Sequence, residues 1–79
     1  MNEKKLFEII ARVFDIPLNQ VTNQSNSETI EQWDSFTGYI LLDEIESEFN
    51  IIIGMNDSLE IKNVEDFKRI LIKKGIQFE

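Results

Sequence analysis

The 79-residue sequence contains neither cysteine nor histidine, and its formal net charge is −7. These absences exclude disulfides, thiolate chemistry, the common zinc sites and every catalytic arrangement that needs an imidazole. A chain of this length forms one small domain, residues 1–79, which apolar packing must hold together. Such a domain has little room for a pocket of about 300 Å³ or more, so we expect a protein that other enzymes act on and that is not itself an enzyme.

The charges are unevenly distributed along the chain. Residues 13–61 contain no lysine or arginine, whereas ten aspartates and glutamates fall within them. This acidic stretch argues against nucleic acid or an anionic membrane as a partner and predicts attraction to basic protein surfaces. Taken alone, it would also fit a merely solvated surface. The N-terminal residues begin an amphipathic pattern, so we expect no signal peptide, no membrane insertion and a cytoplasmic location.

The first part of the chain predicts one helix and one long loop. Apolar residues recur at helical spacing from Glu3 to Asp15, which is typical of an amphipathic helix. Pro17 ends this pattern, because the residue before a proline is pushed out of the helical region. Residues 18–32 are mostly Asn, Gln, Ser and Thr and predict a loop, which Val21 and Ile30 would pin to the core.

A second helix is predicted to begin at Asp34 or Ser35. Asn50 suits the left-handed residue that commonly follows a helix. The expected buried stripe comprises Phe36, Ile40, Leu41, Leu42, Ile45 and Phe49. The rest of the circumference carries Asp43, Glu44, Glu46 and Glu48. Gly38 would allow a neighbouring segment to approach the helix closely.

The last third of the chain predicts one more helix. Residues 51–53 are isoleucines without an evident partner strand, so we expect an extended connection whose side chains cover the core. A short helical turn is expected over Asp57–Glu60. Asn63 is a good N-cap for a helix that runs from Val64 to Lys74 and ends at Gly75. The predicted fold is therefore all-α, a small antiparallel bundle of three main helices plus one short helix, with a long loop between the first two.

Three stretches of this sequence together resemble the acyl carrier protein family. They are Trp33-Asp34-Ser35-Phe36, the acidic run from Leu41 to Ile51, and Ile61-Lys62-Asn63-Val64-Glu65-Asp66-Phe67. An Asp-Ser pair alone would be a very weak motif, and a serine at a helix start is usually only a cap. The combination found here is much stronger and spans nearly the whole chain. The Asp-Ser pair is followed by an apolar residue, then by an acidic helix that ends in Glu-x-x-Phe, and later by a helix start that reads Asn-Val-Glu-Asp-Phe.

The resemblance implies a specific modification at Ser35. A phosphopantetheinyl transferase would attach 4′-phosphopantetheine from coenzyme A to this hydroxyl, and an acyl or aminoacyl group would then be carried on the thiol as a thioester. Asp34 would help to present the hydroxyl, and Phe36 would anchor the helix start beside the arm. The resemblance also implies an acidic recognition face formed by Asp43, Glu44, Glu46 and Glu48.

The implied partners are enzymes with basic docking patches. They are the phosphopantetheinyl transferase, an acyl- or aminoacyl-ligase and downstream transferases of a biosynthetic pathway. The carrier itself is expected to be a monomer without a bound metal. The alternative from a different class is an acidic helical protein-interaction module with the same bundle but no prosthetic group.

Some residues depart from the most common carrier pattern. Carriers of fatty-acid synthesis commonly have Asp-Ser-Leu-Asp, whereas Phe36 and Thr37 follow the serine here. Trp33 and the uncharged Thr37 are more similar to stand-alone carriers of specialised pathways, which a dedicated ligase loads with an amino acid or a short acyl group. The D-alanyl carrier proteins, which also use Asp-Ser-Phe, are one candidate subclass. We expect Trp33 to pack on the core, and a bundle this rich in phenylalanine to have little room for a long acyl chain.

Overall fold

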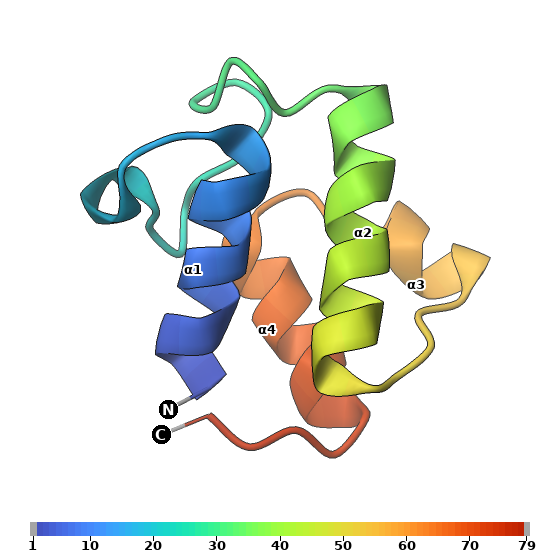
Figure 1. The fold of residues 1–79 in the computed structure, drawn as a ribbon. Coiled ribbons are helices and arrows are strands. Elements are labelled where there is room, and N and C mark those ends of the chain that lie inside the picture. The colour runs from blue at the N-terminus through green and yellow to red at the C-terminus, as the bar shows by residue number, and fades with distance from the viewer. Residues whose placement is uncertain (1, 79) are drawn as a thin grey trace.

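The computed structural model describes residues 2–78 and is built from helices (Figure 1). Its elements are α1 (Asn2–Phe14), the short 3₁₀ turn η1 (Leu18–Gln20), α2 (Ser35–Phe49), α3 (Met55–Leu59) and α4 (Val64–Lys73). Within these residues no strand forms, and the only β-type pairing is an isolated bridge between Asn26 and Asn63. The predicted all-α fold, with three main helices, one short helix and a long first loop, is confirmed.

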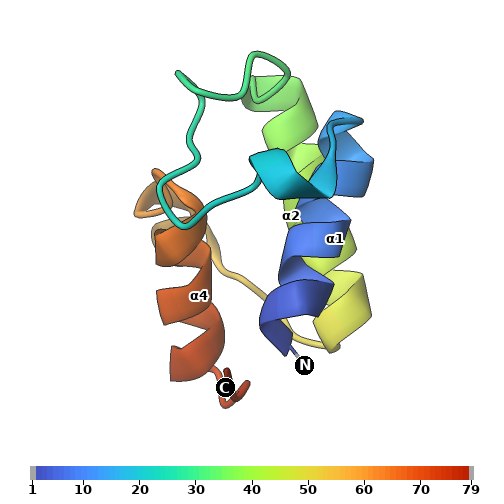
Figure 2. The same ribbon diagram turned by 90° about the vertical axis from the view of Figure 1, so that its left-hand side faces the viewer.

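The three main helices enclose one core. Helices α1 and α2 run antiparallel beside each other, and α4 lies against one side of this pair (Figures 1 and 2). The largest fully buried side chains are Leu6, Ile9, Ile10, Phe14, Leu41, Ile45, Val64 and Leu71. The Asn2 side-chain amide donates a hydrogen bond of 2.6 Å to the Gln77 carbonyl. The two ends of the described chain therefore lie together, at the opposite end of the bundle from the start of α2 (Figure 1).

Each of the three main helices is followed by a residue whose backbone is in the left-handed conformation. Asp15, Asn50 and Gly75 follow them with φ values of 56°, 55° and 98°. In each case the next N–H donates to the carbonyl five residues back: Ile16 to Ala11 (3.0 Å), Ile51 to Glu46 (3.0 Å) and Ile76 to Leu71 (2.9 Å). This is the Schellman arrangement, which satisfies carbonyls that a helix end leaves unpaired. The sequence predicted Asn50 and Gly75 in this role but not Asp15.

The long loop between α1 and α2 supports the start of α4. Two N–H groups of α4 donate to carbonyls of this loop, Val64 to Ser25 O (3.0 Å) and Glu65 to Asn23 O (3.0 Å). A third, that of Asp66, donates to Oδ1 of Asn63, the residue directly before α4 (2.9 Å). A helix start leaves such groups without a partner inside the helix, so the loop and the Asn63 cap supply what is missing. Val21 and Ile30 are buried, as expected, and hold the loop against the core.

The predicted buried stripe of α2 is wrong at its first turn. Leu41, Ile45 and Phe49 are buried, but Phe36 and Ile40 are exposed. The buried residues recur every four positions, and the same spacing leads back to Thr37, so Phe36 lies about 100° away around the helix.

In the connection that follows α2, Ile52 is also exposed, while Ile53 is buried. Alternate side chains of an extended segment point to opposite sides, so this connection covers the core with only part of its isoleucines.

Candidate functional site around Ser35

Asp34, and not Ser35, caps helix α2. The Asp34 carboxylate accepts the Thr37 N–H at 2.9 Å, and the Asp34 N–H donates to the Thr37 hydroxyl oxygen at 3.0 Å. These two bonds form a capping box. The Thr37 backbone N–H, followed by the Thr37 hydroxyl, lowers the pKa of Asp34 below its ordinary value of 3.8. Thr37 therefore has a definite structural task at the position where the sequence departs from the common carrier pattern.

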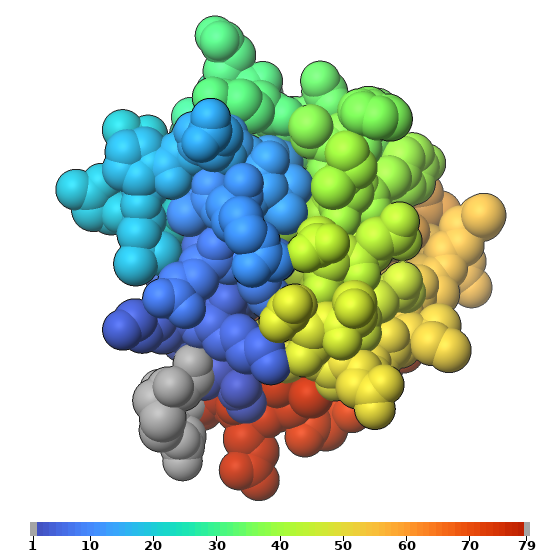
Figure 3. All heavy atoms as spheres, in the orientation of Figure 1, coloured from blue at the N-terminus to red at the C-terminus, as the bar shows by residue number. Residues whose placement is uncertain are grey.

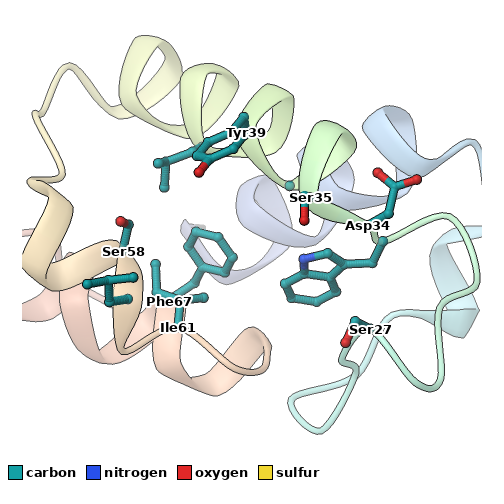
Figure 4. A pocket seen from close by; sticks show the side chains of 11 residues that line it. Ser27, Asp34, Ser35, Tyr39, Ser58, Ile61 and Phe67 are labelled. Atoms are coloured by element: carbon teal, nitrogen blue, oxygen red, sulfur yellow. The ribbon is translucent and has the colours of Figure 1, made fainter.

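The Ser35 hydroxyl is left free by this arrangement. Ser35 is the first residue of α2 and is exposed. Its hydroxyl has no hydrogen-bond partner among residues 2–78, since Asp34 already supplies the cap. In Figure 4 the Ser35 hydroxyl points into a cavity, while the Asp34 carboxylate points away from it. The usual structural explanation for a serine at a helix start does not apply here.

Trp33 places the end of the long loop on the core. Its ring lies 5.4 Å from the ring of Phe14 and 6.2 Å from that of Phe67, centroid to centroid. The expected packing role of Trp33 is therefore confirmed. A Cβ atom on Gly38 would lie 3.5 Å from Trp33 Nε1, which is an ordinary van der Waals distance. Trp33 thus lies close to Gly38, as expected of a neighbouring segment, but the distance leaves enough space for a methyl group.

A cavity of about 530 Å³, largely open to solvent, lies beside Ser35. The expectation that so small a domain has little room for a pocket is therefore wrong. The cavity is lined by Ser27, Trp33, Asp34, Ser35, Gly38, Tyr39, Leu42, Ser58, Leu59, Ile61 and Phe67. Helix α3 on one side of it is only five residues long, and none of its residues is fully buried.

The cavity has a mixed lining. Figure 4 shows Tyr39 reaching over it from α2, with Phe67 and Ile61 at its inner wall and Ser58 and Ser27 at its edges. Asp34 is the only charged residue of the lining, and no lysine or arginine contributes to it. Apolar walls with a few hydroxyl groups suit a neutral chain that has both apolar and hydrogen-bonding parts.

The four carboxylates of the predicted recognition face differ in their surroundings. Glu44 Oε1 lies 2.7 Å from Arg12 Nη2 of α1, and Glu46 Oε2 accepts the Ile53 N–H at 2.6 Å. Asp43 and Glu48 are exposed, and neither carboxylate has an ion-pair partner within the described chain. Helix α2 forms a continuous strip of the surface between α1 and α3 (Figure 3). Of the four carboxylates, Asp43 and Glu48 are therefore the ones without a partner within residues 2–78.

One feature of the site was missed by the sequence reasoning. Asp57 of α3 lies 3.3 Å from Lys73 Nζ and 3.4 Å from Lys74 Nζ at the end of α4. The hydrogen bond from Lys73 is the main cause that lowers the pKa of Asp57 below its ordinary value of 3.8. This double ion pair links α3, which forms the outer wall of the cavity, to the end of α4.

No protein-family model matches this sequence, and comparison with curated proteins gives no significant match. Among residues 2–78 no helix is both long and apolar enough to cross a membrane. The same residues contain no cluster of three or more acidic side chains arranged to hold a metal ion. A functional assignment therefore depends on the geometry around Ser35 and on the sequence resemblance.

Proposed function

We propose that this chain is a carrier protein that bears an acyl or aminoacyl group as a thioester on 4′-phosphopantetheine attached to Ser35. The observation that carries this proposal is the free Ser35 hydroxyl. It is exposed, it stands in the first turn of a rigid helix, and Asp34 performs the capping that would otherwise occupy it. A carrier needs such a hydroxyl, accessible to a modifying enzyme yet fixed in position.

The start of α2 also suits a phosphodiester. The positive end of the helix dipole and the backbone N–H groups of a first turn favour a phosphate at this point. The cavity beside Ser35, with its apolar walls and hydroxyl edges, offers a surface on which a neutral amide-containing arm can rest. A group at the end of such an arm reaches each partner enzyme at a high effective concentration.

The modifying reaction is carried out by a separate enzyme. The Ser35 oxygen forms a new bond to the phosphorus of the pantetheine phosphate, adenosine 3′,5′-bisphosphate leaves, and the serine proton passes to a base of the phosphopantetheinyl transferase. An acyl- or aminoacyl-ligase then loads the thiol, and downstream transferases remove the cargo. Because its partners depend on coenzyme A, this carrier works in the cytoplasm. It acts there as a monomer.

Intact-mass measurement tests the proposal directly. The protein is incubated with coenzyme A, magnesium and a broad-specificity phosphopantetheinyl transferase, and the mass of one phosphopantetheine group should be gained. Ser35→Ala should gain none. Ser27→Ala and Ser58→Ala are matched controls, because both hydroxyls line the same cavity, and they should be modified fully.

Two outcomes would overturn the proposal. One is a wild-type chain that gains no mass under conditions in which a known carrier is modified completely. The other is a Ser35→Ala variant that gains the same mass as the wild type. Either result would favour the acidic interaction module that keeps this bundle without a prosthetic group.

A further inference from the structure

The indole N–H of Trp33 has no acceptor within residues 2–78. The only buried side-chain polar atom without a hydrogen-bond partner in this part of the chain is Oδ1 of Asn23. The unpartnered Nε1 of the half-buried Trp33 is therefore an accessible atom, and Trp33 helps to line the cavity beside Ser35. An indole N–H can only donate, and in packed surroundings it usually has a partner. The chain thus holds an unused donor at this cavity.

The direction of this donor is fixed by the core. The Trp33 ring lies 5.4 Å from the ring of Phe14 and 6.2 Å from that of Phe67, so aromatic side chains of α1 and α4 hold it. Its backbone N–H donates to the Ile30 carbonyl at 3.0 Å. A donor that is already held in place loses little conformational entropy when it binds an acceptor. Trp33 is therefore preorganised for a ligand in the cavity.

The N–H edge of the ring lies on the same side of α2 as Ser35. A Cβ atom on Gly38 would lie 3.5 Å from Trp33 Nε1 and 3.7 Å from Cδ1, so this edge of the ring lies against α2 at Gly38. Gly38 follows Ser35 by three residues, which places the two on one face of the helix. Both line the cavity, into which the Ser35 hydroxyl points (Figure 4). A group bonded to the Ser35 oxygen would begin beside the indole N–H.

A phosphodiester on Ser35 would need neutral donors. Residues 13–61 contain no lysine or arginine, and none lines the cavity, so no cationic side chain is at hand for the charged oxygens. The N–H of Thr37 in the first turn is already used by the Asp34 carboxylate. A hydrogen bond from an N–H group to an anionic oxygen is shorter and stronger than one to a neutral oxygen. The free indole N–H matches this need.

We propose that Trp33 is a binding residue for the prosthetic group, whose indole N–H donates a hydrogen bond to a phosphate oxygen of the phosphodiester on Ser35. This inference rests on the proposed carrier function. It adds a second task to a side chain that packing alone would explain. The bond would fix the first atoms of the arm relative to α2, while the rest of the arm stays free to move.

Nuclear magnetic resonance of the wild-type chain tests the bond directly. Trp33 is the only tryptophan, so a ¹⁵N-labelled sample gives a single indole signal. After modification with coenzyme A and a phosphopantetheinyl transferase, we expect its proton signal to move downfield. Its exchange with water should slow about tenfold or more, the factor that corresponds to a hydrogen bond with a charged acceptor. Ser35→Ala, treated in the same way, should show neither change.

Trp33→Phe separates the hydrogen bond from packing. Phenylalanine keeps an aromatic ring against Phe14 and Phe67 but has no N–H. Urea unfolding is measured for the wild type and this variant, each with and without the prosthetic group. We expect the substitution to lower the folding equilibrium constant about tenfold more in the modified pair than in the unmodified pair. A role in packing alone would give the same loss in both pairs.

Tyr39→Phe is the matched control. It removes the other aromatic donor that lines the cavity, from a side chain that is 69% exposed. This change should have the same effect on stability with and without the prosthetic group. A coupling that belongs to Tyr39→Phe and not to Trp33→Phe would contradict the proposal. Modification of both variants should still reach completion, because Ser35 and its Asp34 cap are unchanged.

The outcomes distinguish this proposal from the proposed function. If Ser35 is modified while the indole signal and its exchange rate stay unchanged, Trp33 does not bind the phosphate and the carrier proposal stands. Equal losses of stability in the two pairs of the Trp33→Phe comparison would lead to the same conclusion. A wild-type chain that is never modified would overturn both proposals.

Discussion

Asp34 and Thr37 hold each other at the start of α2 through two hydrogen bonds of 2.9 and 3.0 Å. The Thr37 hydroxyl also donates to the Gln32 carbonyl, so the same side chain fixes the last residues of the long loop. Ser35 lies between the two capping residues. The position of its hydroxyl is therefore set by a polar contact in which the serine side chain takes no part.

Removal of the cap should loosen the turn that presents Ser35. We expect Asp34→Ala to lower the urea midpoint of unfolding and to speed amide exchange in residues 35–38, because the Thr37 N–H loses its acceptor. Asp34→Asn should keep most of the stability, since asparagine is an equally good cap. Glu31→Ala, a nearby exposed carboxylate in the loop, is the control. Equal midpoints for Asp34→Ala and the wild type would contradict the capping argument.

Gly38→Ala should stabilise the protein. Glycine inside a helix costs about 0.5–1 kcal/mol relative to alanine, and the new methyl group would lie at an ordinary distance of 3.5 Å from Trp33 Nε1. The free energy of unfolding, measured by urea titration, should rise by about that amount. Gly75→Ala is the contrasting variant, because its φ of 98° disfavours a side chain, and it should destabilise. Destabilisation by Gly38→Ala would mean that the Trp33 contact cannot accept a methyl group.

Loss of the Asp57 ion pairs should release α3 locally. We expect Asp57→Asn to speed amide exchange in residues 55–60 while the exchange of α1 and the rest of α2 stays unchanged, because Asp57 bridges α3 to both Lys73 and Lys74. Added salt should produce the same change in the wild type. Glu60→Gln removes an exposed carboxylate next to the same helix and should have no such effect. Unchanged exchange in Asp57→Asn would show that other contacts hold α3.

Acid should weaken the start of α4 through Asp66. Burial raises the pKa of this carboxyl, but the Lys62 N–H and the Arg69 guanidinium outweigh that effect and hold the pKa below its ordinary value of 3.8. Because the folded pKa is the lower one, the stabilisation is present above about pH 3.8 and is lost as the pH falls through the folded value. Urea titrations between about pH 5 and 2.5 should show a shallower decline for Asp66→Asn than for the wild type. A parallel decline would exclude Asp66 as a contributor.

The free carboxylates of α2 should matter more for association than the engaged ones. We expect Asp43→Lys to slow modification of Ser35 at low salt, and the deficit should shrink as salt rises, because exposed charges act mainly on the rate of encounter. Glu46→Ala should leave the rate nearly unchanged and should instead lower stability, because it removes the acceptor of the Ile53 N–H. Equal effects of the two changes on the rate would contradict this division of the acidic face.

The helices could be predicted because their signals are local. Apolar periodicity, the Asn63 cap and the left-handed residues Asn50 and Gly75 all act within a few residues of the chain, and each is found where expected. The predicted turn at Asp57–Glu60 was placed two residues late, since α3 begins at Met55. A five-residue helix has too few apolar repeats to fix its start from sequence.

The surroundings of Ser35 could not be predicted in the same way. The sequence identified the serine, but the assignment of the cap to Asp34, the cavity and the exposure of Phe36 depend on how separate elements are packed. Phe36 fits an apolar stripe on spacing alone, and its exposure depends on how α2 is packed against the rest of the bundle. The bond between Asp57 and Lys73 joins residues that no local pattern connects.

The hydrogen bond between Asn2 and Gln77 has a practical consequence for handling this protein. Both ends of the described chain lie at the pole opposite the start of α2 (Figure 1). An affinity tag, a fluorophore or a surface linker attached at either end would leave the serine and the aromatic side chains of α2 facing solution. Because the two ends are adjacent, a short linker could join them, and a circularly permuted chain opened elsewhere should retain the bundle.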